Sequence, residues 1–155
     1  MFRRILDFFL FSSLFISCCA TLMVYQTIQL AQIGGNTFSL YSFVFFFFFF
    51  SYNTHWYFTP VAKNERSRSV WTQKHMRLQL FLAIAGAIGS FCFLPYFLPV
   101  VHWLLPAVLL TFLYTAPKIP LNAFRFLKKL AIGKTIYLAV VWTYVTAAMP
   151  LLLYE

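Results

Sequence analysis

The chain has few charged residues, and almost none of them are acidic. Charged residues make up 10% of its 155 residues, and only Asp7, Glu65 and Glu155 are acidic. Because a soluble domain carries about 25% charged residues, a chain this poor in charge cannot cover itself with polar surface. Hydrophobic residues make up 62% of it, with a mean hydropathy of +0.79. The apolar residues come in blocks long enough to cross a bilayer, which predicts an integral membrane protein.

The shortage of carboxylates also excludes most catalytic and metal-binding arrangements. The sequence has no carboxylate pair, no Ser-His-Asp set, no phosphate-binding loop and no HExxH motif. Its three histidines, His55, His75 and His102, lie in separate segments. Its cysteines lie in apolar runs without CxxC spacing, which favours packing over a disulfide or a metal site. The cysteines are Cys18, Cys19 and Cys92. We therefore expect no catalytic residue, no metal and no cofactor.

Five long apolar segments divide the chain. They cover about residues 5–33, 37–59, 78–95, 98–115 and 135–153. In a bilayer every backbone N–H and C=O needs an internal partner, so each segment is expected to be a helix. The run Phe45–Phe50 contradicts the alternating pattern of a β-barrel strand. We predict an all-α fold, a polytopic integral membrane protein with five transmembrane helices in a single domain, residues 1–155.

The positions of the basic residues predict the orientation of these helices. All 12 Lys and Arg lie before the first segment, between the second and third, or between the fourth and fifth. The opposite connections, around Gly34–Asn36 and Leu94–Pro99, have none. By the positive-inside rule the N-terminus is cytoplasmic and the C-terminus is outside. The net charge of +9 is then explained by the orientation of the helices in the membrane and by contact with anionic lipid, and it does not require binding to nucleic acid. We expect a multi-pass protein of a bacterial inner (cytoplasmic) membrane.

The second segment ends at the cytoplasmic side in a polar and aromatic string, Ser51–Thr59. Its tryptophan and tyrosines suit an interfacial aromatic belt. Asn53 and His55 fit a belt less well, because polar side chains in a membrane helix usually face a protein interior or a wet cavity. Two interpretations stay open: a structural helix end, or the lining of a cavity that faces the cytoplasm.

The fourth segment ends in a second unusual string, Thr111–Pro120, at the same cytoplasmic level. Tyr114 and Lys118 lie in this string, close to the basic residues of the adjoining connections. Together they can form a basic vestibule that suits an anionic head group on an apolar tail, such as a phospholipid or a polyprenyl diphosphate. The alternative is a lysine that only extends from a helix end toward water.

The string Tyr114-Thr-Ala-Pro-Lys118, between an apolar helix and a basic connection, resembles the UbiA superfamily of intramembrane prenyltransferases. The resemblance covers most of this chain and about the first half of a family member. It implies that the family's first polar motif corresponds to the end of the second segment, near Asn53. The candidate substrate-binding residues are therefore Asn53, His55, Tyr114 and Lys118.

The chain departs from the family where the family binds Mg²⁺. Asn53 is a counterpart of the family's asparagine, but no aspartate follows it before Pro60. Since Mg²⁺ requires oxygen ligands, mainly carboxylate and phosphate, ionisation of an allylic diphosphate is not expected from this chain alone. Three hypotheses follow: a degenerate UbiA-like protein that binds an isoprenoid or lipid, a structural or assembly subunit of a larger membrane complex or homo-oligomer, or the N-terminal half of an active prenyltransferase.

The third segment contains a run of small residues, Ala83–Ser90. Membrane helices associate closely through small residues, because these let the two backbones approach. We predict that the helix over 78–95 is the most closely packed of the five, and that replacing Gly86 by leucine impairs assembly.

Overall fold

A computed structural model describes residues 2–59, 67–115 and 134–154, and the side chains of 5–59, 70–112 and 138–154 within them. All regular structure in these ranges is helical, which confirms the predicted all-α class. The elements are α1 (Phe2–Phe11), α2 (Leu14–Leu30), α3 (Phe38–Tyr57), α4 (Ser67–Lys74), α5 (Met76–Phe93), the 3₁₀ helix η1 (Leu94–Val100), α6 (Val101–Thr115), α7 (Lys134–Thr143), the π-helix η5 (Tyr144–Ala148) and α8 (Met149–Tyr154).

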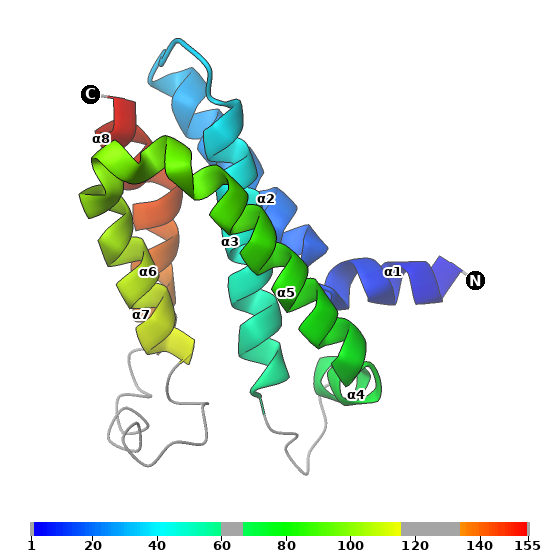
Figure 1. The fold of residues 1–155 in the computed structure, drawn as a ribbon. Coiled ribbons are helices and arrows are strands. Elements are labelled where there is room, and N and C mark those ends of the chain that lie inside the picture. Colours follow the sequence, from blue (N-terminus) through cyan, green and yellow to red (C-terminus); the bar gives the residue numbers. More distant parts are fainter. Residues whose placement is uncertain (1, 60–66, 116–133, 155) are drawn as a thin grey trace.

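The long helices form an antiparallel bundle (Figure 1). Helices α2, α3, α5, α6 and the continuous α7–η5–α8 rod alternate in direction along the chain, whereas α1 points away from the bundle. Four of the five predicted segments match helical stretches to within a few residues. Neither α4 nor the π-helical turn was predicted, because short polar helices and π turns have no strong sequence pattern.

The expectation of one helix over residues 5–33 is wrong. The structure has two helices there, α1 and α2, which meet at 59°. The break lies at Ser12 and Ser13, and Ser13 has a left-handed backbone with φ of 66°. Short hydroxyl side chains compete with backbone hydrogen bonding and weaken a helix interior. The Ser17 hydroxyl donates to the Ser13 carbonyl at 3.0 Å and so satisfies an acceptor at the start of α2.

Helix α3 lies at the centre of the core. It packs most extensively against α5 and next against α2. Several helices bury one residue per turn, at a spacing of four, which places these residues in a row along one face. The rows are Ala20, Val24 and Ile28 on α2, Leu40, Val44 and Phe48 on α3, and Val141, Val145 and Met149 on the final rod.

The contact between α3 and α5 depends on two glycines. A Cβ atom placed on Gly86 would lie 2.6 Å from the Phe50 backbone nitrogen and 2.8 Å from its Cα. A Cβ atom on Gly89 would collide with the Phe46 ring. At Gly86 the closest atoms are backbone, so no larger residue fits there without moving a helix, whereas at Gly89 the Phe46 ring would have to shift. Helix α5 therefore packs closely on α3, but the prediction that it is the most closely packed of the five helices is wrong. It buries only Gln79, Ala83 and Gly86, whereas α3 buries residues along its whole length.

One helical stretch is long and apolar enough to cross a membrane. It is Met76–Phe112, and only 17% of its most apolar part is buried, unlike the core helix of a soluble protein. The bent pair α1–α2 also qualifies if its two parts are counted together, whereas the last rod, Leu138–Tyr154, is apolar but shorter. The structure therefore supports membrane association without confirming all five predicted crossings.

The π-helical turn arises next to a proline. Pro150 has no N–H, so it cannot donate to the Thr146 carbonyl four residues earlier. The chain widens here, and the Met149 N–H donates to the Tyr144 carbonyl five residues back. The Thr146 carbonyl instead accepts a hydrogen bond of 2.8 Å from the Thr27 hydroxyl of α2. The tertiary contact with α2 thus supplies the donor that the proline lacks.

Replacing Thr27 by valine should loosen the contact between α2 and the last rod. The isosteric change removes the donor to Thr146, and hydrogen bonds between membrane helices contribute about 0.6 kcal/mol on average and about 1.7 at most. We expect a loss of about 1 kcal/mol in unfolding free energy, measured by denaturant titration in detergent micelles. Thr27→Ser keeps the donor and serves as the control; equal losses in the two variants would contradict the assignment.

Candidate functional site

The end of α3 presents its two unusual polar residues to different neighbours. Asn53 and His55 are both buried, with exposures of 0% and 6%. Residues that are two apart in an α-helix are separated by about 200° around the helix axis. The side chains of Asn53 and His55 therefore leave nearly opposite sides of α3. Asn53 turns to α5, and His55 turns to the space between α3, α6 and α7. The sequence analysis treated the two as one site, and the helix geometry separates them.

Asn53 forms a buried amide pair with Gln79 of α5. The Gln79 Nε2 donates to the Asn53 Oδ1 at 2.7 Å, and the Asn53 Nδ2 donates to the Phe49 carbonyl at 2.7 Å. Gln79 is also fully buried, and its Oε1 has no hydrogen-bond partner among the described residues. The Asn53 amide is thus committed to packing α3 against α5. Sequence reasoning missed Gln79, although it lies one turn before Ala83 on the small-residue face.

His55 lines a small cavity between three helices. Four of the residues that line it are polar: Ser51, Tyr52 and His55 of α3 and Thr111 of α6. The Trp142 indole N–H of α7 donates to the Tyr52 hydroxyl at 2.8 Å and fixes that side of the cavity. The remaining lining residues are apolar: Phe47, Phe48, Leu138 and Val141. This is where polar side chains from separate helices face one another.

The cavity is too small for a whole head group. The space open to the centre of a water-sized sphere is about 20 Å³. A single water needs roughly 10–15 Å³ on this measure, so the cavity holds one water or one polar ligand atom. Any larger ligand would have to sit at its mouth and extend one group toward His55.

The other two candidate residues lie at the edge of the described chain. Tyr114 belongs to the last turn of α6, three residues after Thr111, and its side chain is outside the described set. Residues three apart share a face of a helix, so the Tyr114 backbone position continues the row that reaches the cavity. Lys118 lies outside the described residues. The structure thus brings His55 together with Thr111, whereas Asn53 is part of a separate contact.

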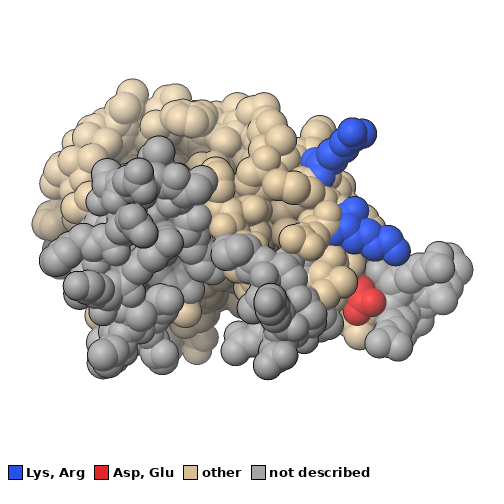
Figure 2. Space-filling view, turned by 90° about the horizontal axis from the view of Figure 1, so that it is seen from below, with Lys and Arg blue, Asp and Glu red and all other residues tan. Residues whose placement is uncertain are grey.

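A second, open concavity lies where α4 meets α5. Lys74 and Arg77 line it together with Tyr57 at the end of α3. Figure 2 looks onto this end of the bundle and shows the described Lys and Arg side chains projecting from one edge of it. Their position at the end that carries the basic connections agrees with contact to anionic head groups.

No family model, curated protein or solved structure matches this chain. In the part of the chain that the structure describes, no three residues among His, Cys, Asp and Glu lie close enough to hold a metal ion.

Proposed function

We propose that this chain is a membrane protein with five helical crossings that binds a lipid or isoprenoid head group at its cytoplasmic end, without catalysing a reaction. The alternating direction of the long helices supports the topology (Figure 1), as does the restriction of all Lys and Arg in the sequence to the N-terminus and alternate connections. The outward faces support it as well: Phe81, Ile84 and Ile88 of α5 are more than half exposed and follow one another at helical spacing.

The observation that carries the binding proposal is the polar side of the small cavity. Ser51, Tyr52, His55 and Thr111 of two different helices face one space, whose other lining residues are apolar or aromatic. Polar groups inside a membrane protein are costly and usually mark a binding or transport site. A phosphate or hydroxyl oxygen of a head group can reach His55 at the mouth. Tyr114 lies in the last turn of α6, and Lys118 follows three residues after its end.

The UbiA resemblance suggests a similar arrangement of helices but not the prenyl transfer reaction of that superfamily. The ligand class it suggests is a membrane lipid or a polyprenyl diphosphate, held by His55, Tyr114 and Lys118. Asn53, the counterpart of a family residue, instead holds α3 against α5 through Gln79. With no aspartate after Asn53 and no described metal cluster, the proposal includes no prenyl transfer.

Native mass spectrometry and equilibrium binding of the purified chain test the proposal. With polyprenyl diphosphate and phosphatidylglycerol as separate probes, we expect saturable binding of one of them. Lys118→Ala should weaken binding about tenfold or more, because a hydrogen bond to a charged group contributes about 1.5–3 kcal/mol. Lys74→Ala is the comparison for loss of one cation at the same end of the bundle; it should weaken binding less than Lys118→Ala, because Lys74 lies away from the cavity.

A second pair of variants tests the cavity itself. His55→Phe removes the imidazole and fills the small space, so it should also weaken binding about tenfold, which corresponds to about 1.4 kcal/mol. His102→Phe is the control, because His102 is exposed at the start of α6. Absence of saturable binding to either probe, or equal affinities for all four variants and the parent, would overturn the proposed function.

A structural role in a larger membrane assembly is the second candidate. It is favoured by the exposed apolar residues at the far end of the bundle, where Phe91, Tyr96 and Leu98 are more than half exposed around η1. In the bilayer these side chains can meet either lipid or another protein. A stable stoichiometric partner or a homo-oligomer in native mass spectrometry, combined with no ligand binding, would favour this candidate.

A further inference from the structure

Helix α1 is the most strongly amphipathic of the described long elements, and it lies apart from the bundle. It leaves the line of α2 at 59°, whereas a continuous first span would be straight. Its exposed apolar residues are Ile5, Leu6, Phe8 and Phe9, with exposures of 59%, 45%, 39% and 38%. At about 100° per residue, Ile5, Leu6 and Phe9 share one side of the helix, Arg3, Arg4 and Asp7 fall on the other, and Phe8 lies at the border between the two.

The opposite side of α1 is held by α4. The Trp71 ring of α4 lies 6.5 Å from the Phe8 ring and 5.8 Å from the Phe11 ring, centroid to centroid. Trp71 itself stacks on His75 at 4.6 Å. Helix α4 lies at the end of the bundle that carries the basic connections (Figure 1). One side of α1 therefore rests on a polar helix at the cytoplasmic end.

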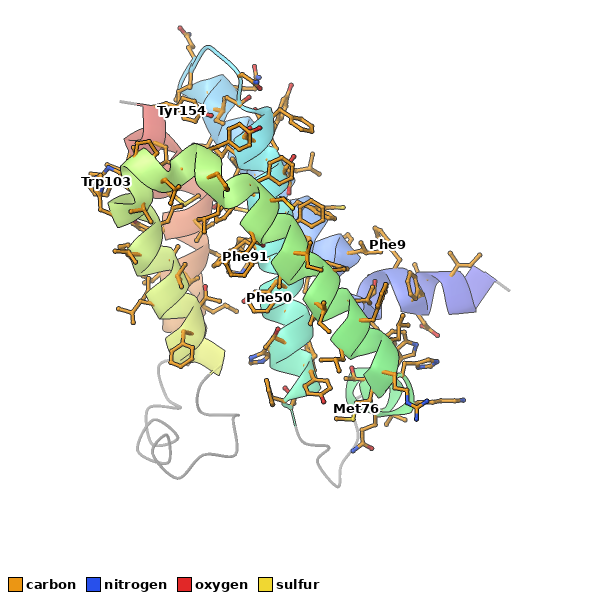
Figure 3. The ribbon with its side chains drawn as sticks, viewed as in Figure 1. Phe9, Phe50, Met76, Phe91, Trp103 and Tyr154 are labelled. Carbon is orange, nitrogen blue, oxygen red and sulfur yellow. The ribbon has the colours of Figure 1, made fainter. Side chains whose placement is uncertain are left out.

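The exposed apolar side of α1 faces along the long axis of the bundle, away from the end where α4 lies. Phe9 contacts Phe15 of α2, with ring centroids 5.9 Å apart. Figure 3 shows Phe9 on the side of α1 that faces away from α4. If the bundle crosses a bilayer, this side faces the acyl chains and the Arg and Asp side faces water. The apolar side then contacts the acyl chains and the polar side contacts the head groups and water, which is the arrangement of an interfacial helix.

We infer that α1 lies in the plane of the cytoplasmic membrane surface, with Ile5, Leu6 and Phe9 inserted among the lipid acyl chains. The ligand of this face is the lipid itself rather than a second copy of the chain. The inference rests on the proposed membrane insertion of the bundle but not on head-group binding at His55. Its consequence is that the first crossing consists of α2 alone.

Spin labels on single cysteines test the placement of α1. The full chain, with its three native cysteines replaced by alanine, is reconstituted into vesicles of phosphatidylcholine and phosphatidylglycerol. Labels at positions 5, 6, 7 and 9 are probed with oxygen, which concentrates in the hydrocarbon, and with a water-soluble nickel chelate. We expect labels at 5, 6 and 9 to share one depth, about 5–10 Å below the head groups, and the label at Asp7 to be accessible to the chelate.

Other profiles overturn the inference. A helix that crosses the membrane would change depth by about 1.5 Å per residue, so a steady gradient from 5 to 9 would contradict an in-plane helix. Labels at 5, 6 and 9 shielded from both reagents would mean that a protein covers the face. A label at Leu22, which is 64% exposed on α2, is the control: if it is not in the hydrocarbon, membrane insertion itself fails, whatever the result for α1.

Discussion

Replacing Gly86 by leucine should lower the free energy of unfolding by about 3 kcal/mol, the upper part of the usual range for overpacking. Even a Cβ atom at this position would lie 2.6 Å from the Phe50 backbone nitrogen. Backbone cannot rotate away as a flexible side chain can, so the whole of α5 would have to move from α3. Because this is the most extensive helix contact, its separation should affect the entire bundle.

Gly34→Leu is the control that separates the effect of close helix packing from the effect of replacing any glycine by leucine. A Cβ atom on Gly34 meets nothing within 4 Å, and its backbone is not left-handed, so Gly34→Leu should have little effect. Gly86→Ala should give an intermediate loss. Unfolding is followed by circular dichroism during denaturant titration in micelles. Equal midpoints for Gly86→Leu and Gly34→Leu would refute the close packing of α3 and α5.

Replacing Asn53 by leucine should destabilise the protein more than replacing its partner Gln79 by leucine. Without Asn53, the buried Gln79 amide loses its hydrogen bond at 2.7 Å and keeps an Oε1 that already has no partner in the described part of the chain. An unsatisfied buried polar group costs about 1–3 kcal/mol. The reverse variant removes that unpartnered oxygen together with the rest of the Gln79 amide. It leaves only the Asn53 Oδ1 without its donor, and the Asn53 Nδ2 still donates to the Phe49 carbonyl.

A double-mutant cycle measures the coupling of this pair. The double variant, with leucine at both positions, should be more stable than the sum of the single losses predicts, by up to about 1.7 kcal/mol. Gln29→Leu is the control, since Gln29 is an exposed amide on α2. Additive losses in the cycle would show that the two amides do not interact. Weakened ligand binding in Asn53→Leu at unchanged stability would return Asn53 to the list of ligand-binding residues.

Much of the helical framework was predictable because apolar length and breakers are local properties. The turn at Gly34–Asn36 separates α2 from α3, and Gly35 has a φ of 105° that favours glycine. Helix α5 ends at Phe93, just before Pro95, where the 3₁₀ helix η1 begins. The break at Ser12 and Ser13 was not predicted. Two serines in an apolar run are compatible with a continuous helix, and here contacts of α1 with α4 accompany the bend.

The candidate site was predicted in its location but not in its membership. The sequence drew attention to the end of α3 and the end of α6, and the structure does bring Ser51, His55 and Thr111 around one space. It separates Asn53 from them and adds Trp142, from nearly a hundred residues later in the chain. Tyr114 and Lys118 remain predictions that rest on the sequence.

The sequence by itself determined that this protein is helical and largely apolar, with its basic residues confined to the N-terminus and alternate connections, because those properties depend only on composition and on the order of the segments. Only the tertiary structure decided which side of each helix is buried. Helix α3 is apolar around most of its circumference, so hydrophobic periodicity cannot orient it. Its orientation is set by where α5 offers Gly86 and Gln79, and that choice directs Asn53 into a helix contact and His55 toward the cavity.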